Sequence, residues 1–168
     1  MISNAERAKL PRKFKVVAVG GTFDEFHKGH RALLSKAFEV SERVLIGLCT
    51  DEFVRRMRKP HPVDCYEKRL EELKNFLRSH GWLERAEIIP LNDRYGVTLS
   101  GGCVEALVVS RETEPTAHEI NEKRKEKGLP PLEIIVIEMV PAENHVPIST
   151  TRIRRGEIDR EGRLLKEN

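Results

Sequence analysis

Short runs of apolar residues, rich in valine, isoleucine and leucine, recur along the chain between longer polar or mixed stretches. The five runs cover residues 16–19, 43–49, 86–91, 105–110 and 132–140. Runs of this length, closed by glycine or polar residues, are typical of strands buried within a sheet. We therefore expect a sheet of about five strands with both faces covered.

A helical pattern follows the first run. Beyond Lys28, the apolar residues Leu33, Leu34, Ala37 and Phe38 recur with the spacing of one helix face, and polar residues lie between them. Strand, helix and strand at this spacing predict a right-handed crossover, so the neighbouring strands should be parallel. Further helices are expected over residues 65–77 and 115–128, and a last one is expected at Ser149 or Thr150, whose hydroxyls can cap it.

The alternation of strands and helices predicts an α/β fold. With 168 residues, the chain is expected to form a single doubly wound, Rossmann-like domain, with a ligand at the carboxyl edge where the strand order reverses. We assign this domain to residues 13–160, with a poorly ordered arm over residues 1–12 and a C-terminal tail over residues 161–168. The polar stretches 50–62 and 92–102 are expected to be loops near the site.

Composition narrows the function classes. The chain is 39% hydrophobic and 34% charged, as in soluble domains with a heavily charged surface. The sequence shows neither an apolar run long enough to cross a bilayer nor a secretory signal, so we expect a cytoplasmic protein without a membrane partner. The three widely spaced cysteines indicate neither disulfides nor zinc. A net charge of +3 is too small to imply a nucleic-acid partner, and we expect none, but basic clusters at residues 55–59 and 152–155 suit a small polyanion.

The junction between the first strand and its helix is the best candidate for a binding site. Two glycines, residues 20–21, are expected to close the strand in a tight turn, and Thr22, His27 and His30 follow. Such junctions bind anions, because free amides and the positive end of the helix dipole point into the crevice. His27 and His30, three residues apart, could both donate hydrogen bonds to a phosphate. Gly29 would let a polyphosphate approach the backbone closely.

Two motifs at this junction and near the C-terminus resemble a known superfamily. GTFDEFHKGH, residues 21–30, resembles the H-x-G-H motif of nucleotidyltransferases, and ISTTRIR, residues 148–154, resembles their I-S-S-T-x-I-R motif with one threonine for serine. ALVVSRET, residues 106–113, and KGLPPLEI, residues 127–134, are similar to the archaeal and eukaryotic branch of the phosphopantetheine adenylyltransferases. Two motifs in the right order make a stronger case than either alone, and the resemblance extends over residues 15–155.

The resemblance implies transfer of AMP from ATP to 4′-phosphopantetheine, which gives dephospho-coenzyme A and pyrophosphate, with Mg²⁺ bound mainly through the phosphates of ATP. It implies that His27 and His30 bind the triphosphate. Thr22 would orient the acceptor phosphate and Lys59 would neutralise it, unless a shift of one residue gives Arg58 that role. Further ATP contacts are implied at Gly21, Phe23, Arg111, Glu112, Thr113, Ser149, Thr150, Thr151 and Arg154. The sequence does not give the oligomeric state.

Alternatives are compatible with parts of the sequence. A flavin adenylyltransferase or a glycerol-phosphate cytidylyltransferase would share the first motif. A non-catalytic nucleotide- or RNA-binding module is disfavoured because only 5% of the residues are aromatic, and a class I aminoacyl-tRNA synthetase fragment would carry a KMSKS loop. The histidine pair lacks nearby partners for zinc. Asp24 and Glu25 could order magnesium-bound water, Lys59 could lie in a solvated loop, and Thr113 could have a local structural role.

Overall fold

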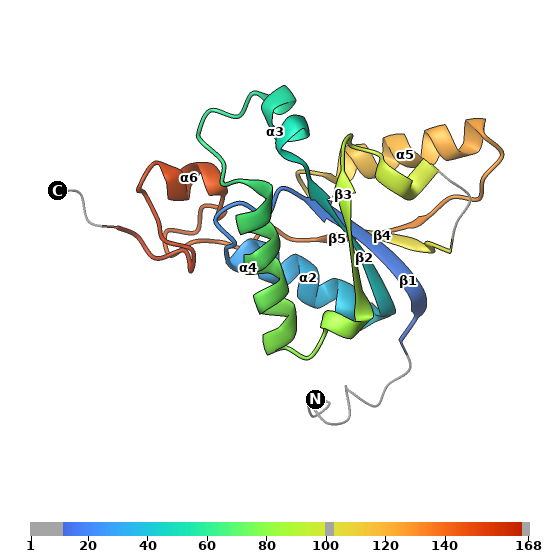
Figure 1. Ribbon diagram of the computed structural model, residues 1–168, viewed down its shortest axis with the longest axis horizontal. Helices are drawn as coiled ribbons and strands as arrows, with labels where there is room; N and C mark the ends of the chain where they lie inside the picture. The colour runs from blue at the N-terminus through green and yellow to red at the C-terminus, as the bar shows by residue number, and fades with distance from the viewer. Residues whose placement is uncertain (1–11, 100–102, 166–168) are drawn as a thin grey trace.

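The computed structural model describes residues 12–99 and 103–165 (Figure 1). These residues form one five-stranded sheet in the order β3-β2-β1-β4-β5, in which all neighbours are parallel. The strands are β1 (Phe14–Gly21), β2 (Ser41–Cys49), β3 (Ala86–Leu91), β4 (Ala106–Ser110) and β5 (Glu133–Ile137). The expected doubly wound parallel sheet is confirmed, and the strand order reverses between β1 and β4.

Helices cover both faces of the sheet. α2 (Lys28–Val40) and α4 (Tyr66–Ser79) pack on one face, whereas α5 (Glu114–Glu126) and the 3₁₀ turn η2 (Gly96–Leu99) pack on the other (Figure 1). A second 3₁₀ turn, η1 (Leu83–Arg85), leads into β3. α3 (Asp51–Met57) and α6 (Thr150–Arg154) lie near the carboxyl edge of the sheet, so they can contribute to a site there.

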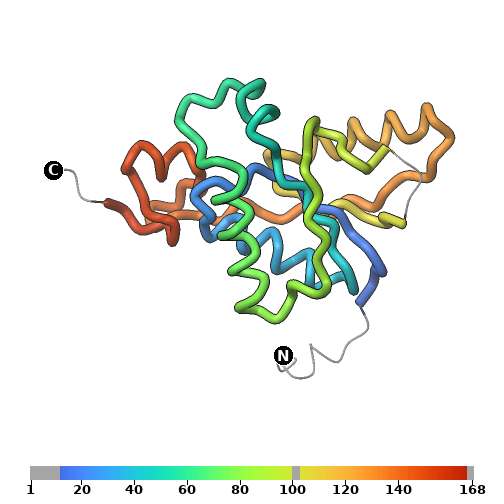
Figure 2. Tube along the Cα trace, in the orientation of Figure 1, coloured from blue at the N-terminus to red at the C-terminus, as the bar shows by residue number. Residues whose placement is uncertain are grey.

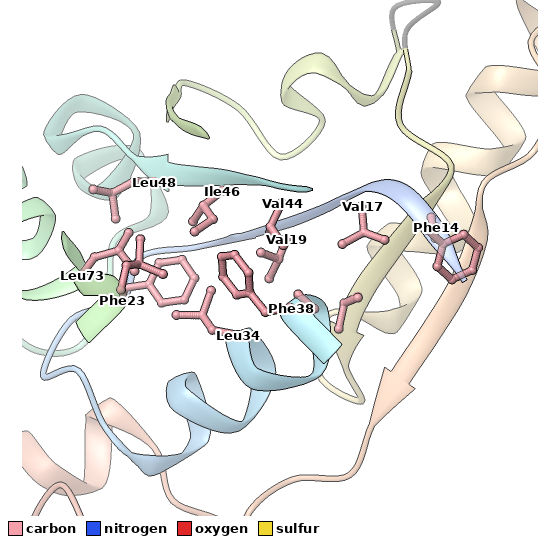
Figure 3. Packing of buried hydrophobic residues seen from close by; sticks show 14 of the residues in the cluster. Phe14, Val17, Val19, Phe23, Leu34, Phe38, Val44, Ile46, Leu48 and Leu73 are labelled. Atoms are coloured by element: carbon pink, nitrogen blue, oxygen red, sulfur yellow. The ribbon is translucent and has the colours of Figure 1, made fainter. Parts of the chain in front are cut away.

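The core has one layer on each side of the sheet, because alternate residues of a strand point to opposite faces. Val17 and Val19 of β1 pack with Leu34 and Phe38 of α2 (Figure 3). Ala18, between the two valines, belongs to the second cluster beneath α5. Each large aliphatic side chain buried in this way contributes about 1.5–3 kcal/mol. The core therefore provides a rigid base for the strand ends.

The two glycines expected to form a tight turn lie within β1 instead. A Cβ at Gly20 would lie 3.4 Å from the Leu91 side chain, and one at Gly21 would lie 3.3 Å from the Phe23 ring. The chain turns later, at Phe23 and Glu25, whose φ angles of 53° and 52° lie in the left-handed region that side chains disfavour. The turn that leads to the histidines is therefore strained and needs contacts that hold it.

Two further elements differ from the sequence-based expectation. The stretch 50–62 contains α3, which Thr50 caps by accepting a hydrogen bond from the Phe53 amide at 3.2 Å. Acidic residues in its first turn and basic residues in its last turn complement the helix dipole, but seven residues are too few to show an apolar period. β5 ends at Ile137, short of residue 140.

The C-terminal part of the chain forms a third, small core. Ala142, Ile148 and Ile158 are buried together, and a bridge pairs Ile158 with Leu164. Residues 161–165, assigned from the sequence to a tail, thus fold back beyond α6. The remainder of that tail and residues 1–11 of the expected arm lie outside the described residues.

Candidate active site

The two histidines of the first motif hold each other in place at the start of α2. His27 is the N-cap, and its Nδ1 accepts hydrogen bonds from the amides of Gly29 at 3.0 Å and His30 at 3.4 Å. The Nδ1 of His30 accepts in return from the His27 amide at 3.2 Å, and the ring centroids lie 3.6 Å apart. Because both Nδ1 atoms are acceptors, each neutral ring carries its proton on Nε2. The pair therefore offers two Nε2–H donors.

Gly29 makes room for this arrangement. A Cβ at Gly29 would lie 2.9 Å from Cε1 and 3.0 Å from Nδ1 of His27, which is closer than a real side chain allows. The sequence suggested that this glycine lets a polyphosphate approach the backbone. The structure adds a second reason, because any side chain here would push the His27 ring away from the amides that it caps.

Both rings are neutral at neutral pH. Burial, assisted by the charges of Arg31 and Arg160, lowers the pKa of His27 to about 4. Burial, followed by the proximity of His27 and Lys59, holds the pKa of His30 well below its usual value of 6.5. A bound polyanion would favour the protonated forms and raise both pKa values.

These pKa shifts predict a loss of stability in weak acid. The unfolded chain protonates His27 near pH 6.5, whereas the folded chain does so only near pH 4. The unfolded state therefore binds more protons between these values, and His27 alone should lower the free energy of unfolding by about 2 kcal/mol between pH 7 and pH 5. Urea unfolding of native and His27→Asn protein at both pH values measures this effect. An equal loss of stability in the two proteins would contradict the prediction.

The second motif starts α6 and contacts the first. Ser149 caps α6 by accepting a hydrogen bond from the Arg152 amide at 3.2 Å. The Thr150 hydroxyl donates to the carbonyl of Asp24 at 3.0 Å, although the two residues are 126 positions apart in the chain. The helix starts of both motifs thus lie side by side.

A cluster of charges also joins the two motifs. Asp24, only 2% exposed, accepts from Arg154 through both carboxylate oxygens, at 2.9 Å and 3.2 Å. The same guanidinium lies 3.2 Å from a carboxylate oxygen of Glu25 and 3.2 Å from one of Asp64. The resemblance implied that Arg154 contacts ATP. In the structure, three carboxylates surround its guanidinium, so Arg154 ties α6 to the β1–α2 turn.

A buried arginine supports the carboxyl ends of β1 and β2. Arg69 of α4 is 1% exposed, and its NH1 donates to the carbonyls of Thr22 at 3.0 Å and Cys49 at 2.7 Å. Its Nε donates to the Asp64 carbonyl at 2.8 Å, and NH2 pairs with Asp51 at 3.0 Å. Arg69 therefore joins four segments beside the histidine turn.

The sequence contained a signal for this arginine that the motif comparison missed. Arg69 lies one and two helical turns before Leu73 and Leu77, which are fully buried. A charged residue on the apolar stripe of a helix has to find buried partners, and such a position indicates a structural or functional contact. The residues that it contacts could not be inferred from the stripe alone.

A cavity of about 670 Å³ lies at the carboxyl edge of the sheet. Its lining includes residues from all five strands, on both sides of the boundary between β1 and β4, so the cavity spans the point where the strand order reverses. The predicted site residues in its lining are Gly21, Thr22, Phe23, His27, His30, Lys59, Glu112, Thr113, Ser149, Thr150 and Thr151. Parts of four separate stretches of sequence are thus brought together.

Within the described part of the chain, some predicted site residues lie outside the cavity lining, and one has a side chain that packs within the protein. Arg111 and Arg154 lie outside the cavity lining, and the guanidinium of Arg111 pairs with the exposed Glu138 at 2.6 Å. Phe23 is 1% exposed and packs the edge of its ring against His30, so its side chain supports that histidine. Arg58, the alternative cation, is the left-handed C-cap of α3 and also lies outside the lining.

The residues at 12–99 and 103–165 contain no group of three or more histidine, cysteine, aspartate or glutamate side chains that could hold a metal ion. Asp24 and Glu25, which could have ordered magnesium-bound water, contact arginines instead. A divalent cation here would depend on ligands from a bound nucleotide. Within the same residues, no helix is long and apolar enough to cross a bilayer.

A family model described as cytidylyltransferase-like matches residues 18–156, which include both motifs. The chain belongs to this family. It is 48% identical to the phosphopantetheine adenylyltransferase of Methanothermobacter thermautotrophicus, over 94% of this chain and 93% of that protein. It is 45% identical to the phosphopantetheine adenylyltransferase of Pyrococcus abyssi, over 92% of this chain and 98% of that protein. The resemblance seen in the motifs is confirmed.

Solved structures agree with the fold. A protein of unknown function from Archaeoglobus fulgidus matches with a TM-score of 0.65 and 34% identity, over 74% of this chain and 98% of that chain. A pantoate-β-alanine ligase from Francisella tularensis matches with a TM-score of 0.55 and 14% identity, over 86% of this chain and 67% of that chain. The second likeness, at such low identity, supports the fold alone.

Proposed function

We propose that this chain transfers AMP from ATP to 4′-phosphopantetheine, releasing pyrophosphate and forming dephospho-coenzyme A. One observation carries the proposal: the two motifs converge on a single cavity at the strand-order switch, in a chain that matches phosphopantetheine adenylyltransferases over more than nine tenths of its length. The proposed reaction takes place in the cytoplasm, as expected from the sequence. Mg²⁺ enters as part of the ATP substrate, bound by its phosphates.

In the proposed reaction, an acceptor phosphate oxygen attacks the α-phosphorus of ATP, and the bond to the oxygen that bridges to the β-phosphate breaks. Negative charge accumulates on the departing pyrophosphate, so catalysis depends on positioning and on hydrogen-bond donors. The Nε2–H groups of His27 and His30 donate to the triphosphate. Because burial keeps both rings neutral in the free protein, each presents an oriented Nε2–H donor before the triphosphate binds.

The second motif binds the other side of the triphosphate in this proposal. The Thr150 hydroxyl already donates to Asp24, so the hydroxyls of Ser149 and Thr151 and the amides at the start of α6 remain for the β and γ phosphates. Arg154 acts indirectly, by holding α6 against the β1–α2 turn.

In this proposal, the acceptor and the nucleoside contact different residues of the cavity lining. Thr22 orients the acceptor phosphate and Lys59 neutralises it, since both line the cavity beside the histidines. Glu112 and Thr113, at the end of β4, contact the nucleoside. Arg111 would join them only after leaving Glu138.

Pyrophosphate release tests the proposal. Purified protein is mixed with Mg²⁺ and either ATP or CTP. Each mixture then receives one acceptor, which is phosphopantetheine, glycerol 3-phosphate, flavin mononucleotide or RNA. We expect release only from ATP with phosphopantetheine, because the relatives named for that activity match the whole domain. Release from CTP, or release from ATP only with an acceptor other than phosphopantetheine, would overturn the substrate assignment. It would favour one of the related nucleotidyltransferase activities.

A further inference from the structure

The segment that follows α6, residues 156–165, folds back against the turn that carries the histidines (Figure 2). Ile158 anchors this segment, because it is fully buried in the third core. The carbonyl of Arg160 accepts a hydrogen bond from the amide of Lys28 at 2.9 Å. This amide is the first of α2 and follows His27 directly. The C-terminal segment thus completes the cap of the histidine helix.

The Arg160 side chain contacts the same turn, but it is not among the described residues that line the cavity. Its Nε donates to a carboxylate oxygen of Glu25 at 3.0 Å, and NH1 and NH2 each lie 3.3 Å from Oε1 of Glu72. Glu25 is one of the residues with a positive φ, a conformation that costs about 1–3 kcal/mol unless surrounding contacts enforce it. The other oxygen of Glu72 is buried without a hydrogen-bond partner among the described residues, so Glu72 depends on Arg160.

Glu25 connects Arg160 to the second motif. Its other carboxylate oxygen lies 3.2 Å from NH1 of Arg154, so Arg154, Glu25 and Arg160 form a continuous chain of charges from α6 to the start of α2. Arg31, on the first turn of α2, pairs with Glu161 of the same C-terminal segment. Two successive residues of this segment, Arg160 and Glu161, therefore contact α2. These contacts restrict the conformation of the turn and of His27, the N-cap of α2.

We propose that Arg160 is a positioning residue for the histidine pair. By fixing Glu25 and the Lys28 amide, it keeps His27 and His30 in their reciprocal hydrogen bonds, which leave both Nε2–H groups available to the anion in the cavity. Arg160 does not touch the substrate and acts through the turn. The identity of the anion rests on the proposed function, but the effect of Arg160 on histidine geometry does not.

Nitrogen-15 NMR of the histidine rings tests the proposal directly, since it reports which nitrogen carries the proton. In the native protein, His27 and His30 should both be Nε2–H tautomers. Arg160→Met should convert part of either ring to the other tautomer and lower kcat about 10- to 100-fold, with the KM for phosphopantetheine nearly unchanged. Arg160→Lys keeps the charge and should restore part of the loss. Arg163→Met, which removes an exposed arginine from the same segment, should behave as native protein.

A second variant tests the hydrogen bond to the Arg160 carbonyl separately from the contacts of the Arg160 guanidinium. Lys28→Pro removes the amide that donates to Arg160, and proline suits the first position of a helix after an extended residue such as His27. It should shift the tautomers with Arg160 intact. Native tautomers and turnover in Arg160→Met would overturn the proposal, even if that variant unfolded at a lower temperature. If the native protein released no pyrophosphate, the proposed function would fail while the tautomers still tested Arg160.

Discussion

Replacing His30 with asparagine should lower turnover by about 10²–10³ while the fold stays intact. The asparagine side-chain oxygen can accept from the His27 amide, as Nδ1 of His30 does at 3.2 Å, so the reciprocal cap persists. The Nε2–H donor is lost, and with it a preorganised contact to the charge that accumulates on pyrophosphate. Pyrophosphate release at saturating ATP measures turnover, and thermal unfolding measures the fold.

Two matched variants show whether the donor itself matters. His30→Gln places an N–H donor near the position of Nε2 but gives up the cap, so it should recover part of the turnover. His118→Asn changes an exposed histidine of α5 that pairs with Glu114, and it should keep native turnover. Turnover of His30→Asn within about threefold of native would remove this histidine from the mechanism, because a lost transition-state donor costs far more.

Replacing Arg69 with methionine should lower the free energy of unfolding by about 3 kcal/mol or more. Methionine fills a similar volume, but it leaves the carbonyls of Thr22, Cys49 and Asp64 without the donor that they share. These carbonyls lie around the carboxyl ends of β1 and β2, where unpaired polar groups are costly to bury. Urea unfolding at pH 7 gives the difference in stability from the native protein.

Arg78→Met is the matched control for Arg69, because it removes an exposed arginine from the same helix. Among the described residues, the Arg78 side chain hydrogen-bonds only to Asn75, at 3.0 Å. Its replacement should change the free energy of unfolding by less than about 0.5 kcal/mol. Similar losses in the two variants would mean that the four contacts of Arg69 add nothing beyond helix propensity.

Most elements of the sheet could be predicted from the sequence. The third apolar run was expected at residues 86–91, and β3 spans Ala86–Leu91, because an apolar run between polar flanks has a clear pattern, although this edge strand is only partly buried. α3 was missed because its seven residues make too few turns for a period to emerge. The turn after β1 was placed two residues early, since Gly20 and Gly21 pair with β2 as strand residues, and their Cα hydrogens face Leu91 and Phe23. A glycine in a sequence does not show whether it provides conformational freedom or space.

Some residues of the candidate site could also be assigned from the sequence, and others could not. His27, His30 and Ser149–Thr151 could be assigned because each lies within a short motif at a helix start, and the structure places them in one cavity. Arg69 and Arg160 were missed because their partners lie in other segments of the chain. Their importance depends on which carbonyls and carboxylates the fold brings within about 3 Å, and no local pattern encodes that.

The sequence by itself determined the order of the strands and the longer helices along the chain, the parallel sheet and the two motifs at the carboxyl edge, because periodicity and short-range residue order are local properties. Only the tertiary structure decided which groups each of these arginines contacts. Arg154 belongs to a motif expected at phosphate, yet its guanidinium is held by Asp24, 130 positions away in the chain. The physical reason is that a guanidinium binds a carboxylate as readily as a phosphate, so its partner is decided by which anion the folded chain places beside it.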